Sequence, residues 1–201
     1  MDLWYAPTSP FARKVRVVAH ELGVEGRLRL IETNPWTDER LRALNPLAKV
    51  PTLVLDDGAV VWESGLIAER LASMASAQDL FPAAGEPRWR ALSLQALADG
   101  ASATAGRLFA DENRPPDQRS EAMLARFAAT LEAALDRLEE EPFAAQPTIG
   151  EVAAAVCLGY LDFRWPGRDW RVGRPRLARW SEMFASRPSM IQTAHRLPLQ
   201  P

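Results

Sequence analysis

The stretch VPTLVLDDGAVVWESG, residues 50–65, decides the fold of this chain. Two short apolar runs, residues 52–55 and 60–62, flank Asp57-Gly58, and an Asp-Gly pair between such runs is the strongest short-range signal for a β-hairpin. After the second run, Ser64 begins a segment with helical periodicity. The stretch therefore predicts two antiparallel strands followed by a helix.

The first part of the chain alternates between short apolar runs and amphipathic stretches. Residues 3–5 form a strand candidate. The breakers Ser9 and Pro10 follow, and then a face of apolar residues at helical spacing that ends at Gly23. This segment predicts a strand, a turn and a helix, with Ser9 as the N-cap and Pro10 as the first helical residue.

A second strand and helix are expected before the hairpin. Residues 28–31 are apolar enough for a strand, and residues 37–39 supply a capping oxygen and an acidic first turn for a short helix that reaches about Leu44. Together with the hairpin and its helix, these elements predict a β-α-β-α-β-β-α domain over residues 1–76.

The chain changes character after this domain. Residues 77–87 contain two prolines and a glycine with little periodicity, and we interpret them as a linker. Residues 88–201 keep only helical periodicity and predict an all-helical bundle domain. Thr148 and Glu151 form an S/T-x-x-E capping box, which predicts the start of a buried helix. The other expected helices cover residues 89–108, 124–138 and 174–186.

Composition narrows the classes of function. The chain has 201 residues, of which 47% are hydrophobic and 25% charged, so it can bury a sizeable core. Its net charge of −2 provides no general attraction to nucleic acid or to an anionic membrane. Cys157 is the only cysteine, which excludes an intrachain disulfide, a C-x-x-C redox pair and a multi-cysteine zinc site.

The sequence shows neither a membrane-spanning stretch nor a signal-peptide pattern. The longest charge-free apolar stretch near the C-terminus, residues 152–161, is too short to span a bilayer. The sequence opens with Met1-Asp2 rather than with a basic region before an apolar run. We expect a cytoplasmic protein that binds no metal, no nucleic acid and no membrane.

Most catalytic motifs are absent from the sequence. The run WESG at residues 62–65 lacks the first glycine of a nucleophile elbow, and no P-loop or dinucleotide fingerprint occurs. His20 and His195, the only histidines, have no metal-ligand spacing, and we expect both to be surface or packing residues. These absences weaken hydrolase and nucleotide-binding interpretations.

The turn around Ser9 is the first candidate for chemistry. Ser9 has no neighbouring base in its motif, which argues against Ser-His-Asp catalysis. A hydroxyl at a helix N-terminus can instead donate a hydrogen bond to an anion that the free amides and the helix dipole also favour. If the anion is a thiolate, the pKa of its thiol falls. The alternative is that Ser9 is only a helix cap.

Two further segments point to a peptide-like anionic ligand. A cis Val50-Pro51 bond before a strand would leave the Val50 backbone available to pair with such a ligand. Ser64 and the first amides of its helix can bind a carboxylate, while Glu63 can bind an ammonium. The alternatives are an ordinary loop proline and another helix cap.

In combination, these segments resemble the cytosolic glutathione S-transferase family. The resemblance rests on SPFARK at residues 9–14, NPLAKVP at residues 45–51 and ES at residues 63–64, in that order and spacing, and it extends over nearly the whole chain. It implies an N-terminal thioredoxin-like domain and a C-terminal all-helical domain. Residues 159–164, GYLDFR, resemble bacterial members of the family.

The resemblance is to the classes that use a serine. Ser9 stands at the position where those classes have their serine. Tyr5 precedes the turn, which differs from the classes that use a tyrosine. Position 12 is an alanine and no cysteine lies near the turn, which differs from the classes that use a cysteine. The resemblance implies an enzyme that activates the glutathione thiol, with Ser9 stabilising the thiolate, for attack on a small hydrophobic electrophile. Cys157 is then expected to be a core residue.

The resemblance also implies which residues bind glutathione. Val50 would pair with the cysteinyl backbone, and a cis Pro51 would set the loop. Glu63 and Ser64 would hold the γ-glutamyl end, and Lys49 would meet a carboxylate.

Association and the competing functions follow from the same resemblance. A homodimer is expected, in which Asp99 is a candidate to reach the partner's glutathione amine. A non-catalytic binding or regulatory protein of the same fold is the alternative function, because fold alone does not establish catalysis. Isomerase or reductive thiol-transfer chemistry with the same thiolate is a third possibility.

Overall fold

The computed structural model describes residues 1–75, 80–144 and 146–198, which form two compact units. The first unit extends from Met1 to Ala83 and includes the segment from Arg187 onward; the second is Ala84–Ser186. The grouping of this last segment with the first unit differs from the expected domain limits, which assigned it to the helical domain. Residues 76–79, where the first domain was expected to give way to the linker, lie outside the described residues.

The first unit contains a four-stranded mixed sheet in the order β2-β1-β3-β4. The strands are β1 (Asp2–Tyr5), β2 (Arg29–Glu32), β3 (Thr52–Val54) and β4 (Val60–Trp62). β1 pairs in parallel with β2 and antiparallel with β3, and β3 pairs antiparallel with β4. The Asp-Gly turn joins β3 and β4 with Gly58 at φ +85°, so the hairpin predicted from residues 50–65 is confirmed.

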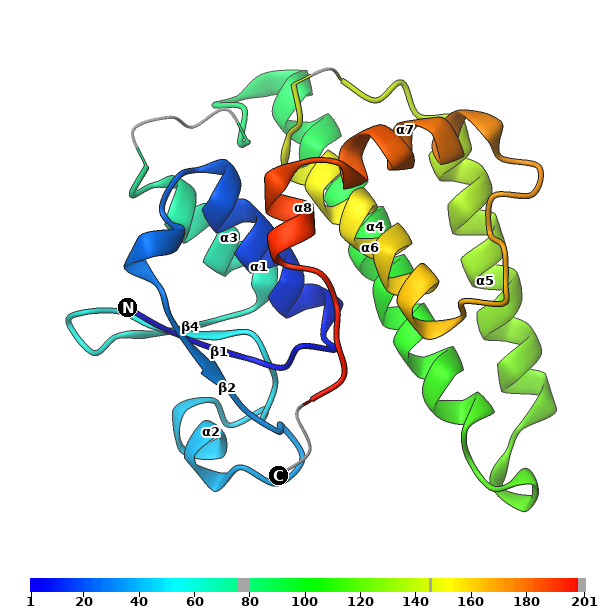
Figure 1. Ribbon diagram of the computed structural model, residues 1–201, viewed down its shortest axis with the longest axis horizontal. Helices are drawn as coiled ribbons and strands as arrows, with labels where there is room; N and C mark the ends of the chain where they lie inside the picture. The colour runs from blue at the N-terminus through cyan, green and yellow to red at the C-terminus, as the bar shows by residue number, and fades with distance from the viewer. Residues whose placement is uncertain (76–79, 145, 199–201) are drawn as a thin grey trace. The chain divides into compact units, whose positions relative to one another are not determined.

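Helices complete this unit. They are α1 (Pro10–Glu21), α2 (Glu39–Leu44), α3 (Ser64–Ala72) and α8 (Pro188–Gln192), with a 3-10 turn at Glu25–Arg27. α1 and α3 lie side by side (Figure 1), and together with β1 and β3 they bury one apolar core. Asp38 is the residue of the 37–39 run that caps α2. The thioredoxin-like α/β fold class is therefore confirmed, while α8 was not expected.

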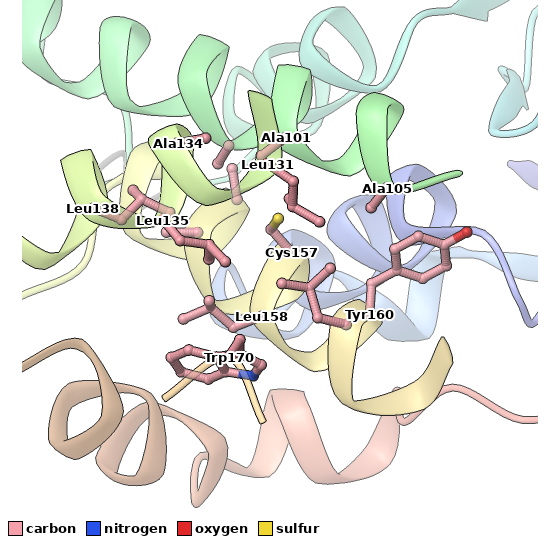
Figure 2. Close-up of a cluster of buried hydrophobic side chains, with 14 of the residues drawn as sticks. Ala101, Ala105, Leu131, Ala134, Leu135, Leu138, Cys157, Leu158, Tyr160 and Trp170 are labelled. Carbon is pink, nitrogen blue, oxygen red and sulfur yellow. The ribbon is translucent and has the colours of Figure 1, made fainter. Parts of the chain in front are cut away.

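The second unit is all-helical. It contains α4 (Gly85–Glu112), a 3-10 turn at Pro116–Gln118, α5 (Glu121–Glu139), α6 (Ile149–Arg164) and α7 (Pro175–Ala185). Its core is a large cluster of leucines and alanines from α4, α5 and α6, and Figure 2 shows Cys157 within it. In the part of the chain that the structure describes, no helix combines the length and apolarity needed to cross a membrane.

The start of α6 is fixed by the predicted capping box. The Gly150 amide donates to Thr148 Oγ1 at 3.2 Å, and the Thr148 amide donates to Glu151 Oε2 at 2.9 Å. Glu151 is fully buried, and its Oε1 also accepts from the Ala144 amide at 3.3 Å. The box is confirmed, and it satisfies the backbone of a helix that is buried almost throughout.

Candidate functional site

Ser9 caps α1 as the sequence predicts. Its Oγ accepts a hydrogen bond from the Ala12 amide at 3.2 Å, and Pro10 is the first helical residue. The Ser9 amide closes a turn onto the Ala6 carbonyl at 3.0 Å. Because the hydroxyl accepts in the cap, its proton is left to donate outward, and Ser9 is only partly buried. The side chain can therefore cap the helix and hold an anion at the same time.

The helix that Ser9 caps is rich in cations. Its first turn contains no acidic residue, and Arg13 and Lys14 are both buried on it. Burial, and after it the charge of Arg16, lowers the pKa of Arg13 to about 10, so Arg13 stays cationic at neutral pH. Added to the positive end of the helix dipole, these charges favour an anion near Ser9.

The loop before β3 is organised by Asn45. This buried side chain donates to the Lys49 carbonyl and to Thr52 Oγ1, both at 3.0 Å, and its Oδ1 accepts from the Leu47 amide at 3.0 Å. The Thr52 hydroxyl also donates to the Lys49 carbonyl, at 2.9 Å. Asn45 was not among the residues predicted to shape the site, although an asparagine at the end of a helix and before a proline is a recognisable turn signal.

Val50 and Pro51 follow in the arrangement that the sequence predicts. The bond between them is cis. Among the described residues, neither backbone group of Val50 is paired with another backbone group, since the ladder of β3 begins at Thr52. Lys49 is exposed beside them. A peptide-like ligand can therefore pair with the Val50 backbone as an additional strand would.

Glu63 precedes α3 in an unusual backbone conformation. It has φ +74° and ψ +119°, a region that a non-glycine residue seldom occupies. Its side chain is exposed and makes no capping hydrogen bond to α3. Ser64, the first helical residue, is buried. The exposed carboxylate of Glu63 therefore lies beside the first amides of α3 without accepting a hydrogen bond from them.

The register of the sheet brings these three segments to one edge. β1 and β3 pair Trp4 with Thr52, and β3 and β4 pair Thr52 with Trp62. The end of β1, the start of β3 and the end of β4 are thus neighbours. Ser9 follows the first of these points, Val50-Pro51 precedes the second and Glu63-Ser64 follows the third, so one edge of the sheet carries all three.

Asp99 and Cys157 lie in the other unit, within the helical bundle. Asp99, on α4, is half-buried, and its Oδ2 accepts from Gln95 Nε2 at 3.4 Å. Cys157 is fully buried, and this burial raises the pKa of its thiol to about 11. A hydrogen bond with Ser102 acts to lower the pKa, and the negative charge of Asp99 raises it further. Cys157 is therefore a protonated core residue at neutral pH, and the contact of Asp99 with a partner chain stays a prediction.

The Ser9 turn has contacts that sequence reasoning missed. His195 Nδ1 lies 3.2 Å from the Pro7 carbonyl, and Arg196 pairs with Glu32 of β2. His195 was expected to be a surface or packing residue, and a contact two positions before Ser9 was not part of that expectation. These partners are separated by more than 160 positions in the sequence, and no local pattern connects them.

Comparison with known proteins identifies the family of this chain. Residues 8–74 match the family model described as the glutathione S-transferase N-terminal domain, and residues 117–182 match that of the C-terminal domain. The uncharacterized GST-like protein YibF of Escherichia coli (strain K12) is 32% identical over 201 residues, covering 96% of this chain and 98% of YibF.

Solved structures agree as well. A glutathione transferase family member from Pseudomonas fluorescens Pf-5, crystallised with bound glutathione, is 36% identical with a TM-score of 0.93, covering 98% of this chain and 99% of that one. A glutathione S-transferase from Methylobacillus flagellatus, with glutathione bound, is 29% identical with a TM-score of 0.90, covering 97% and 99%. With its fold, both family models and relatives over nearly its whole length in agreement, this chain belongs to the glutathione S-transferase family.

Proposed function

We propose that this protein is a glutathione transferase that activates the glutathione thiol and directs it at a small hydrophobic electrophile. The observation that carries the proposal is the meeting of Ser9, Val50-Pro51 and Glu63-Ser64 at one edge of the sheet. Relatives whose crystal structures hold glutathione support the choice of ligand.

Each segment has a defined part in this proposal. The Val50 backbone pairs with the cysteinyl residue of glutathione, which places the thiol near Ser9. Glu63 binds the γ-glutamyl ammonium, and Ser64 with the first amides of α3 binds its carboxylate. Lys49, exposed beside Val50, meets a second glutathione carboxylate.

The chemical step needs only electrostatic help from the protein. The bound thiol loses its proton to solvent, and the thiolate accepts a hydrogen bond from the Ser9 hydroxyl. The N-terminal dipole of α1 and the buried charge of Arg13 also favour the anion. The sulfur electron pair then forms a bond to the electrophilic carbon. In a substitution, a leaving group departs with its bonding electrons. In an addition to an activated double bond, the carbanion that results takes a proton from water.

The proposal extends to assembly and location. We propose a homodimer, supported by exposed apolar side chains on β4 and α3, and a cytoplasmic location, supported by a single cysteine that is kept as a thiol.

The test of catalysis is the Ser9→Ala variant. Loss of a hydrogen bond to a charged acceptor costs about 1.5–3 kcal/mol, so the pKa of the thiol of bound glutathione should rise by roughly 1–2 units. The pKa is measured from the ultraviolet absorbance of the thiolate in the complex. Ser9→Thr keeps both the hydroxyl and the cap and should stay near the wild-type value.

Two controls separate the interpretations. Thermal melting of both variants measures the loss of the α1 cap, which is expected to cost about 1 kcal/mol. An unchanged thiol pKa in a folded Ser9→Ala variant would remove Ser9 from the mechanism. Binding of glutathione without turnover of any of a panel of electrophiles would instead identify a non-catalytic binding protein.

A further inference from the structure

The segment of residues 187–198, here called the strap, lies along α1 within the first unit. In Figure 1 this red segment passes beside the blue helix. It begins at the C-terminal end of α1, where Arg187 pairs with Glu21 at 2.5 Å and Ser189 also donates to that carboxylate. Burial opposes ionisation of Glu21, but the hydrogen bonds from Arg187 and Ser189 outweigh it and lower its pKa. The strap is thus anchored by a charged pair at neutral pH.

The middle of the strap is held by cations of α1. Arg13 Nη2 donates to the Met190 carbonyl at 3.1 Å, and Arg16 Nη2 donates to the Gln192 carbonyl at 3.4 Å. Met190 is buried in this contact region. The helix that carries Ser9 at its N-terminus therefore also fixes the course of the strap.

The far end of the strap reaches the turn that contains Ser9. His195 Nδ1 lies 3.2 Å from the Pro7 carbonyl; since a carbonyl can only accept, Nδ1 carries the proton and donates. Arg196 then pairs with Glu32, and its Nη2 lies 3.5 Å from the Tyr5 hydroxyl at the end of β1. The turn from Ala6 to Ser9 is consequently held from outside as well as by its own chain.

We propose that His195 is a positioning residue for Ser9, which rests on the proposed function of the Ser9 hydroxyl. The Pro7 carbonyl is two residues from Ser9, and the turn between them is closed by one hydrogen bond, from the Ser9 amide to the Ala6 carbonyl. Holding the Pro7 carbonyl fixes the peptide plane on which the turn is built. The distance from Oγ to the glutathione thiolate then depends on the strap as well as on α1.

The test compares three variants at this end of the strap. His195→Ala removes the donor, His195→Asn keeps an N–H close to the Nδ1 position, and Leu197→Ala changes an exposed neighbour that lies in the same segment. Wild-type binding of glutathione is measured first by calorimetry. The pKa of the bound thiol and the kcat/KM for an electrophile are then measured for each protein.

We expect His195→Ala to raise the bound thiol pKa by roughly 0.5–1 unit and to lower kcat/KM about three- to tenfold, the effect of one neutral hydrogen bond. Affinity for glutathione below the thiol pKa should change less than about twofold, because the γ-glutamyl contacts remain. His195→Asn and Leu197→Ala should match the wild type. A purely structural role would lower the melting temperature of His195→Ala and leave the thiol pKa unmoved.

Several results would overturn the proposal. An unmoved thiol pKa in folded His195→Ala would exclude a positioning role, as would an asparagine variant that is as impaired as the alanine variant. If His195→Ala does not fold, His195→Gln provides the same test, because its amide is displaced by one methylene and should not restore the pKa. Failure of the wild type to bind glutathione would overturn the proposed function and this inference together, whereas binding with an unmoved pKa overturns the inference alone.

Discussion

Glu63 occupies a backbone conformation that costs a non-glycine residue about 1–3 kcal/mol, at φ +74°. The side chain gains no capping hydrogen bond in return. Glycine would adopt this conformation without strain, and the proposed function gives a reason for a carboxylate at this position instead. The proposed need is to bind the ammonium of the γ-glutamyl group.

The Glu63→Gln variant tests this assignment. It removes the charge but keeps the shape, so affinity for glutathione should fall about tenfold while turnover at saturation changes little. Calorimetry with glutathione and with its des-amino analogue is the measurement, since loss of the ammonium should weaken binding to the wild type and hardly affect the variant. Glu25→Gln, an exposed change of the same charge, is the control. Equal losses for both proteins would show that Glu63 does not contact the amine.

At the scale of elements, α4 and α6 approach each other closely at Gly150. A Cβ at this position would lie 2.8 Å from the Ala91 carbonyl oxygen and 2.8 Å from the Leu94 Cβ. Because one of these atoms belongs to the helix backbone, the contact cannot be relieved by a change of rotamer. The absence of a side chain at Gly150 therefore sets how closely the two helices pack.

Gly150→Ala is expected to lower the free energy of unfolding by about 1–3 kcal/mol, the usual cost of overpacking. Urea denaturation followed by circular dichroism measures the change. Gly100→Ala is the matched control on α4: nothing lies within 4 Å of its Cβ position, and it should be neutral or more stable by up to about 1 kcal/mol. Equal stability of the two variants would mean that the helices adjust without cost.

Local signals are what made parts of the fold predictable. The Asp-Gly hairpin, the Ser9 cap and the Thr148 capping box each depend on residues within a few positions of one another, and all three are confirmed. The cis Val50-Pro51 bond is confirmed as well. α8 has only five residues, too few to show a helical period, and it was not expected.

Contacts between distant parts of the sequence could not be predicted in this way. The pairing of Glu21 with Arg187 spans 166 positions, and it places the last described segment in the first unit rather than in the helical one. The three site segments were identified from their residue types, but their meeting at one edge follows from the strand register, which periodicity alone does not specify.

At the scale of the whole molecule, the proposed homodimer has a candidate surface in the first unit. Trp62, on the edge strand β4, is 39% exposed, and Leu66, on α3, is 58% exposed. Exposed apolar and aromatic side chains are typical of the cores of interfaces. We propose that α3 packs against α4 of the partner about a twofold axis.

Leu66→Lys should shift the protein from dimer to monomer, because it places a charge in the proposed contact. Val172→Lys, an equally polar change at an exposed valine of the helical unit, should not. Sedimentation at several concentrations, with and without glutathione, is the measurement; if Asp99 reaches the partner's ligand, glutathione tightens association. A species of 22.3 kDa at every concentration that binds glutathione with full affinity would contradict both the dimer and the shared site.

The single buried cysteine can report on the opening of the helical unit. A maleimide or disulfide reagent reacts with the thiolate of an accessible cysteine, whereas Cys157, on α6, is fully buried in the core that α6 shares with α4 and α5 (Figure 2). Modification of Cys157 in native buffer therefore requires that these helices separate. Its rate measures the opening of the helical unit and is insensitive to fluctuations of the first unit. The chain thus presents no cysteine thiol of its own at the surface to compete with the proposed thiol co-substrate, and the proposed activity should persist when oxidants convert exposed cysteines of other proteins to mixed disulfides.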